Sequence, residues 1–177
     1  IDDAVWQYRK DRLLQGEPLL KFGRGALVHF AVSNNEIQMT TKLAGPKTVF
    51  LPFNLGRDGG AGNPVNPDGS ATSYLWERVL QRDNWLQILE RFVNQQTTEK
   101  VDPVSGTRNR SEQIIFPRFH QWEAVTSLLN ETRAEGPGQK YLIQHSAGSG
   151  KTNSIAWLAH GLANLHDDND AKVFDSV

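Results

Sequence analysis

The sequence predicts an α/β fold, and two stretches carry this prediction. An apolar run at residues 141–143 breaks into glycines and a Lys-Thr pair, and an amphipathic segment follows, which is the order strand, phosphate loop, helix. Further upstream, a short polar turn separates the apolar run at residues 26–32 from the alternating run at residues 37–43, which predicts a β-hairpin. Strands and amphipathic helices are therefore expected within 177 residues, a length that can bury one core or parts of two.

Composition places the chain among folded, soluble proteins. Hydrophobic residues make up 38% and charged residues 22% of the sequence. No run reaches the roughly 18 apolar residues that a membrane span needs, and there is no cysteine for a disulfide or a thiolate metal site. We therefore expect a cytoplasmic protein with no membrane partner. The net charge of −1 gives no basic signature, so composition by itself does not indicate DNA binding.

Both ends of the sequence look cut. The chain begins without methionine inside a stretch, residues 1–12, whose apolar residues have helical spacing. It stops at residues 172–177, where a new strand is expected. We expect the chain to be a piece of a longer protein.

The first third of the chain is expected to be mainly extended. Residues 26–32 are expected to form a central strand covered on both faces, because the run is nearly continuous, and residues 48–51 a third short strand. His29 has no second histidine or carboxylate cluster at ligand spacing, which favours a core histidine over a metal ligand. Residues 52–71 are rich in Gly and Pro, but no helix and no Lys-Ser or Lys-Thr pair follows, so we expect an ordered surface loop.

The middle of the chain is expected to be helical and then polar. Two helices are predicted between residues 73 and 93, with Trp76 and Trp85 buried at core spacing. The polar residues 94–113 are expected to form a linker. Residues 114–121 are expected to enter a further helix, and the Gly-Pro-Gly sequence at residues 136–138 ends that helix.

A phosphate loop is expected directly before the last helix. Gly148 and Gly150 have no Cβ, so the backbone can wrap closely around phosphate oxygens. Lys151 is expected to reach the β- and γ-phosphates of a nucleoside triphosphate, and the Thr152 hydroxyl to hold Mg²⁺. His145 stands where the strict pattern has glycine or alanine, so the match is the relaxed form. The alternative is a plain Gly-Ser turn with a solvated lysine.

The helix after this loop is expected to bury one apolar face. The members of that face, which follow helical spacing, are Ile155, Leu158, Ala159, Leu162 and Leu165.

Gln121 is a candidate for nucleotide recognition. It follows aromatic residues and lies one helix before the phosphate loop. A carboxamide offers one acceptor and two donors, so Gln121 can bind the N6 amino group and N7 of adenine while a neighbouring aromatic ring packs on the base. The sequence thus favours ATP as the nucleotide.

Several of these stretches resemble one family. Residues 116–122 and 142–160 resemble the Q motif and motif I of the restriction (R) subunit of type I restriction-modification enzymes. Shorter upstream stretches are similar to the same subunit: residues 50–54, 60–64, 74–77 and 80–83. His145 fits this family, because the family's own motif I resembles His-Ser-Ala-Gly-Ser-Gly-Lys. The resemblance therefore spans nearly the whole chain.

The resemblance implies an α/β fold in which the end of a PD-(D/E)xK-type nuclease domain is joined by helices and a linker to the first part of a RecA-like P-loop helicase lobe. On this basis residues 1–51 are the C-terminal part of the nuclease domain. Residues 52–113 are a Gly/Pro-rich loop, a helical connector and a linker, and residues 114–177 begin the first ATPase lobe. The nuclease carboxylates would lie before Ile1 and the Walker B acid after Val177.

The resemblance also implies an activity. In such an R subunit, ATP hydrolysis drives translocation of double-stranded DNA, and endonucleolytic cleavage follows. The implied cofactors are ATP and Mg²⁺, and the implied partners are double-stranded DNA and the methyltransferase (modification) and specificity subunits. We expect the 177 residues by themselves to hold nucleotide weakly and not to turn it over, because they lack a general base and an arginine finger.

Carried over by position, the resemblance assigns the site residues. Those expected to contact the nucleotide are Gln121, Ser146, Ala147, Gly148, Ser149, Gly150, Lys151 and Thr152. Lys151 and Thr152 are also expected to act in ATP turnover, with Thr152 as the metal ligand. Gln7 resembles the glutamine of a Q-x-x-x-Y element, but the fifth position is Asp11 rather than tyrosine, which leaves the role of Gln7 open.

Two other functions stay open from the residues alone. A different superfamily 2 helicase or a nucleotide kinase would share the phosphate loop, although Gln121 and the upstream similarity argue against a kinase. A non-enzymatic binding or scaffold segment, whose glycine loop is only a turn, is the third possibility.

Overall fold

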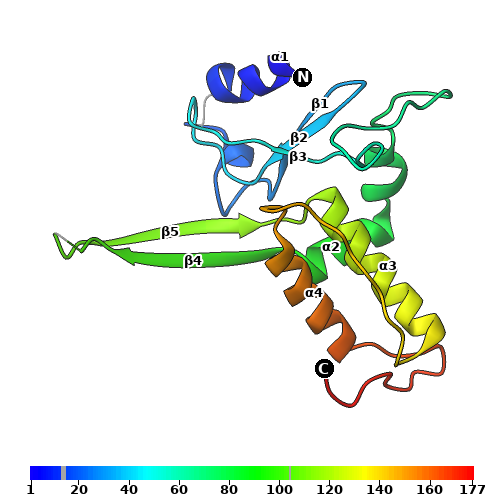
Figure 1. The fold of residues 1–177 in the computed structure, drawn as a ribbon. Coiled ribbons are helices and arrows are strands. Elements are labelled where there is room, and N and C mark those ends of the chain that lie inside the picture. Colours follow the sequence, from blue (N-terminus) through cyan, green and yellow to red (C-terminus); the bar gives the residue numbers. More distant parts are fainter. Residues whose placement is uncertain (13–14, 104) are drawn as a thin grey trace. The chain divides into compact units, whose positions relative to one another are not determined.

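The structure, a computed structural model, describes residues 1–12, 15–103 and 105–177. It is a mixed α/β chain with two small sheets, which confirms the predicted class at this level (Figure 1). Its contacts divide it into two compact units, Ile1–Arg118 and Phe119–Val177. Within the described residues, no helix has both the length and the apolar character to cross a membrane.

The first unit begins with a helix, as the spacing of residues 1–12 predicts. The α-helix α1 (Asp2–Trp6) continues into the π-helix η1 (Gln7–Asp11). Gln7 is the first residue of η1 and is exposed. A short 3-10 helix, η2 (Pro18–Leu20), follows.

A three-stranded antiparallel sheet forms the centre of the first unit. Its strands are β1 (His29–Val32), β2 (Ile37–Thr40) and β3 (Leu51–Pro52), in the order β1-β2-β3. The predicted hairpin is confirmed, whereas the third strand, predicted at residues 48–51, forms at Leu51–Pro52. The prediction of a central strand at residues 26–32 is wrong, because β2 is the middle strand and Val32 of β1 is 39% exposed. Only alternate residues of β1, His29 and Ala31, are buried.

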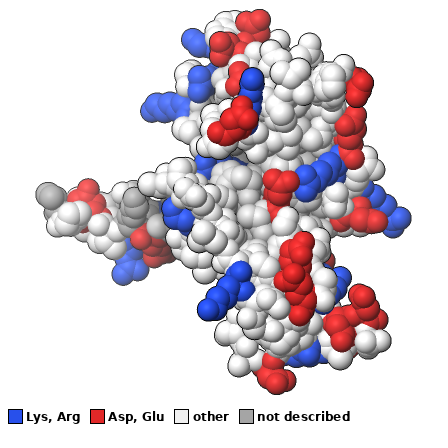
Figure 2. Space-filling view, turned by 45° about the vertical axis from the view of Figure 1, so that its right-hand side comes forward, with Lys and Arg blue, Asp and Glu red and all other residues white. Residues whose placement is uncertain are grey.

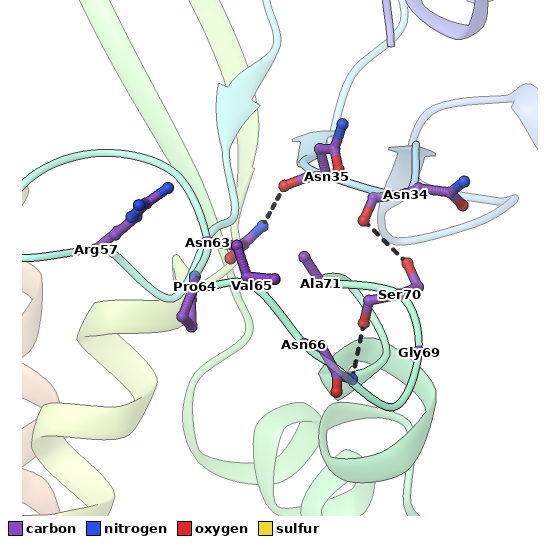
Figure 3. Close-up of a pocket in the computed structure, with 10 residues that line it drawn as sticks. All are labelled: Asn34, Asn35, Arg57, Asn63, Pro64, Val65, Asn66, Gly69, Ser70 and Ala71. Atoms are coloured by element: carbon purple, nitrogen blue, oxygen red, sulfur yellow. Dashed lines mark hydrogen bonds between the residues drawn. The ribbon is translucent and has the colours of Figure 1, made fainter.

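The Gly/Pro-rich stretch at residues 52–71 is an ordered loop, as predicted. Asn63 holds it in place, since its side-chain oxygen accepts the Leu55 N–H at 2.8 Å. The Asn63 Nδ2 atom donates to the Asn35 carbonyl at 2.9 Å (Figure 3). It also donates to Asn54 Oδ1 at 3.0 Å. A single buried carboxamide therefore joins the loop to the β1–β2 turn.

Two helical segments follow the loop. They are the π-helix η3 (Leu75–Val79) and the α-helix α2 (Arg82–Arg91). Trp85 contacts the Phe116 ring at a centroid distance of 6.0 Å, whereas Trp76 is 47% exposed. The predicted burial is therefore wrong for Trp76 and only partly met by Trp85, which is half-buried. Leu75 and Val79 are the buried residues of η3.

The segment predicted as a linker, residues 94–113, is a β-hairpin instead. Strands β4 (Asn94–Val101) and β5 (Arg108–Ile115) pair along their whole length, from Asn94 opposite Ile115 to Val101 opposite Arg108. Beyond the paired residues, the Asp102 N–H donates to the Thr107 carbonyl at 2.9 Å, and Val104 lies outside the described residues. Hydrophobic alternation did not predict these strands, because most side chains of the hairpin are exposed on both faces.

The hairpin is attached to the rest of the first unit at its base. Thr41 Oγ1 donates to the Ile114 carbonyl at 2.9 Å, and Lys42 Nζ donates to the Glu112 carbonyl at 3.2 Å. Further along β5, Arg110 pairs with the carboxylate of Glu112 at 2.9 Å on the exposed surface.

The second unit consists of two packed helices and the loop between them. They are α3 (Phe119–Glu135) and α4 (Lys151–Ala163), which lie side by side in Figure 1. The predicted end of α3 is confirmed, since Gly136 follows it with φ +77°. Residues 114–121 lead into this helix, as predicted, since β5 ends at Ile115, Pro117 follows it and α3 begins at Phe119.

The buried face of α4 differs from the predicted one. Ser154 and Trp157 are its buried residues, whereas Ile155 is 67% exposed. Gly161 lies so close to α3 that a Cβ added to it would be 2.7 Å from Leu129 Cδ1. Gly161 therefore allows close approach to α3. Of the predicted apolar face, Leu165 is buried, Leu158 and Leu162 are half-buried, and Ile155 and Ala159 are exposed, so the prediction holds only in part.

The strand predicted at residues 141–143 does not form. Leu142 is 92% exposed, and no strand occurs in the described residues of the second unit. The strand expected at residues 172–177 does not form either, and Lys172 takes part only in an isolated bridge with His166. A strand needs a hydrogen-bonded neighbour, and an apolar run without one stays irregular.

Lowering the pH should destabilise the chain through His29. Burial lowers the pKa of His29 below its ordinary value of 6.5, and the Arg12 guanidinium lowers it further. Below that value the unfolded chain binds more protons than the folded chain, so the free energy of unfolding falls as the pH drops through 6.5 toward the folded-state pKa. Urea titrations between about pH 7.5 and about pH 5 should give a smaller pH slope for His29→Gln than for wild type. An unchanged slope contradicts this, and the exposed His160→Gln is the control.

Removing the Asn63 side chain should destabilise the first unit. Asn63→Ala leaves the Leu55 N–H and the Asn35 carbonyl without their partner, so we expect a loss of about 1–3 kcal/mol in the free energy of unfolding. The exposed Asn109→Ala in β5 is the matched control, with an expected change within about 0.5 kcal/mol. Urea titration of both variants measures the difference, and equal stabilities would contradict the assigned role.

Candidate functional site

The loop between α3 and α4 has the backbone that a phosphate loop needs. Gly148 and Gly150 have φ values of +72° and +83°, in the left-handed region that favours glycine. Gly150 is the N-cap of α4, a helix of 13 residues, so Lys151 and Thr152 are its first two residues. A Cβ at Gly148 would meet no atom within 4 Å, so backbone conformation rather than crowding within the chain selects glycine there.

Lys151 folds back over the start of the loop. Its Nζ donates to the carbonyls of His145 at 3.1 Å and Ser146 at 3.0 Å. Lys151 is exposed, but its ammonium group lies against the loop. Because these partners are uncharged carbonyls, the positive charge of Lys151 is not neutralised there.

The start of α3 holds the other end of the loop. Gln121 Nε2 donates to the Gly150 carbonyl at 2.9 Å, and His120 Nε2 lies 3.2 Å from the Ser149 carbonyl. Gln121 is buried, with 3% of its surface exposed. Two consecutive side chains of α3 thus contact two consecutive carbonyls of the loop.

These contacts decide where the loop amides point. A trans peptide group is planar, so its N–H points away from its C=O, and no described peptide bond is cis. The carbonyls of His145, Ser146, Ser149 and Gly150 are all held. The opposite N–H groups belong to Ser146, Ala147, Gly150 and Lys151, and none donates a hydrogen bond within the described residues.

The result is a site suited to an anion. Unpaired backbone amides in a loop, followed by the N-terminus of a helix, attract negative charge. The Lys151 ammonium adds a full positive charge beside them. The Ser149 hydroxyl is buried and has no hydrogen-bond partner in the described residues, which leaves one more donor at the loop.

Each predicted site residue has a definite place. Gln121 is bonded to Gly150 and Lys151 to Ser146, as given above, and the Ser149 N–H donates to the Ser146 carbonyl at 3.3 Å. The others are exposed: Ala147, Gly148 and Thr152.

His120 and His145 were not among the predicted contacts. Their rings meet edge to face, with centroids 4.9 Å apart. His120 directly precedes Gln121 in the sequence, but its contact with the loop depends on the packing of α3, which no local pattern reveals.

A polar cavity lies in the first unit. It has a volume of about 390 Å³ and contains one charged side chain, Arg57, whose partner Asp58 is 3.4 Å away at the surface (Figure 3). Its other lining residues are Asn34, Asn35, Asn63, Pro64, Val65, Asn66, Gly69, Ser70 and Ala71. Among the residues that the structure describes, no group of three His, Cys, Asp or Glu could hold a metal ion.

Comparison of the chain with protein-family models, with curated proteins and with solved structures gave no match.

Proposed function

We propose that this chain binds ATP and Mg²⁺ and is part of the DNA-translocating and DNA-cleaving R subunit of a type I restriction-modification enzyme. The observation that carries nucleotide binding is the set of four held carbonyls in residues 145–150, with unpaired amides opposite them. The resemblance of residues 116–122 and 142–160 to the Q motif and motif I of that subunit extends the proposal to the whole protein.

The triphosphate would be held by the loop amides and by Lys151. An ammonium group has three donors, so Lys151 can exchange its two carbonyl partners for phosphate oxygens without losing hydrogen bonds. Charge-assisted bonds to phosphate are stronger than bonds to a neutral carbonyl, which favours the exchange. The chain thus has a hydrogen-bonded arrangement for its lysine both with and without the anion.

Magnesium would be held by Thr152 together with the phosphates. A hydroxyl oxygen is a hard ligand, and Mg²⁺ at nucleotide sites usually takes few protein ligands and keeps several waters. Thr152 is exposed at the start of α4, beside Lys151, so the residues present fit such an ion. When bound, the ion would neutralise charge on the phosphate oxygens.

The base would be read by Gln121. Its Nε2 donates to the Gly150 carbonyl. A carboxamide offers two donors and one acceptor, so on nucleotide binding Gln121 would direct part of this capacity to the edge of adenine. Since only 3% of Gln121 is exposed, contact with the base would be limited to an edge of the side chain. Gln121 would then couple adenine directly to the loop that holds the phosphates.

The remaining assignments rest on the family resemblance. Residues 1–51 would close a PD-(D/E)xK-type nuclease domain, residues 52–113 would connect, and residues 114–177 would begin a RecA-like lobe. Double-stranded DNA and the modification and specificity subunits would be the partners. On the face drawn in Figure 2 basic and acidic side chains are interspersed, so DNA contact is not proposed through a broad basic patch there.

Lys151→Ala should weaken ATP binding. Loss of a charge-assisted bond to phosphate is expected to raise the Kd for ATP with Mg²⁺ by about tenfold to about a hundredfold. Lys140→Ala is the matched control, because Lys140 is also exposed but lies outside the loop. Isothermal titration calorimetry of the 177-residue chain measures both. Equal affinity of Lys151→Ala and wild type would support the scaffold alternative.

Thr152→Ala should make ATP binding insensitive to Mg²⁺. Without the hydroxyl ligand, the Kd of the variant should be similar with Mg²⁺ and with EDTA, whereas wild type should bind more tightly with Mg²⁺. Thr152→Ser keeps the oxygen and should behave like wild type. If Thr152→Ala retains the full Mg²⁺ effect, the ion is held by other groups.

A further inference from the structure

We infer that His120 is a positioning residue for the phosphate loop and that its ring, through His145, joins the two ends of that loop. The inference rests on the proposed function in one respect, namely that the anion held by the loop is a triphosphate. The contacts themselves are those of the chain without any ligand.

The first step is the hydrogen bond at the C-terminal end of the loop. His120 Nε2 lies 3.2 Å from the Ser149 carbonyl, which belongs to the same peptide group as the Gly150 N–H. Holding that carbonyl turns the Gly150 N–H in the opposite direction. Gln121 does the same for the next peptide group, whose N–H belongs to Lys151. His120 therefore sets the direction of one of the unpaired amides.

The second step is the ring contact at the N-terminal end of the loop. The His120 and His145 rings are 4.9 Å apart at an angle of 83°, an edge-to-face arrangement. The carbonyl of His145 accepts a hydrogen bond from Lys151 Nζ. The His120 side chain thus contacts His145 at the start of the 145–150 segment and Ser149 near its end. Movement of either end would break one of these contacts.

The bond to the Ser149 carbonyl also requires a proton at a particular nitrogen of His120. A carbonyl can only accept, so the bond requires a hydrogen on Nε2. The neutral Nε2–H form and the imidazolium form both satisfy this requirement. The role is therefore geometric, and a glutamine, whose Nε2 also donates, can replace it, whereas alanine cannot.

His120 and Gln121 should be separable by the ligand used. The amide that His120 positions would face phosphate, so its effect should be the same for every triphosphate. Gln121 is proposed to read the base, so its removal should also change the ratio of affinities for ATP and GTP.

Calorimetry with ATP, GTP and inorganic tripolyphosphate, each with Mg²⁺, tests this separation. We expect His120→Ala to weaken all three by a similar factor of about ten, which corresponds to about 1.4 kcal/mol. His120→Gln should recover to within about threefold of wild type. Gln121→Ala should lose discrimination between ATP and GTP. Equal binding by His120→Ala and wild type, or an equal loss in His120→Ala and His120→Gln, would overturn the inference.

The amide resonance of Gly150 in the ligand-free chain gives a second readout. His120→Ala should shift this resonance in ¹⁵N-correlated NMR spectra, and His120→Gln should return it toward the wild-type position. If wild type binds no triphosphate, the proposed function fails, and this resonance still decides the role of His120. An unshifted Gly150 resonance in His120→Ala would refute the positioning role even if nucleotide binds.

Discussion

The hydrogen bond from Gln121 Nε2 to the Gly150 carbonyl fixes the point at which the loop enters α4. Because a peptide group is planar, a held carbonyl determines the direction of the following N–H. Lys151 imposes the same constraint on the first part of the loop. The positive φ values of Gly148 and Gly150 let the backbone follow this path without Cβ strain. The proposed anion site is therefore built by holding carbonyls on one side of the loop, which leaves amides on the other.

The first unit is stabilised differently, because a sheet of three short strands buries little apolar surface. Polar groups in its interior supply part of the order. Asn63 satisfies backbone groups from two segments, and the Tyr74 hydroxyl donates to the Phe53 carbonyl at 2.6 Å. Burial raises the pKa of Tyr74 well above its ordinary value, so the donor keeps its proton across the physiological range. The loop at residues 52–71 is thus ordered by specific hydrogen bonds.

The second unit leaves apolar side chains exposed on both sides of its loop. Leu142 is 92% and Ile155 is 67% exposed, although both belong to stretches with the hydrophobic pattern of buried elements. Only one face of α4 is covered, because Gly161 allows close approach to Leu129 on α3. Two helices bury one seam between them, and a strand needs a paired neighbour before its apolar side chains can be covered. The direction of the loop amides does not depend on burial of Leu142 or Ile155, because side chains of α3 and Lys151 hold the loop carbonyls.

The sequence by itself determined the elements whose signals are local. Periodicity and turn residues predicted the β1–β2 hairpin, the end of α3 before Gly136, and α4 after the glycine loop. Only the tertiary structure decided the pairing of β4 with β5, the buried face of α4, and the contacts of His120 with Ser149 and His145. The physical reason is that backbone conformation is encoded within a few residues. Pairing and packing, in contrast, depend on which distant surfaces meet, and a polar ribbon or a histidine beside a glutamine carries no local sign of its partner.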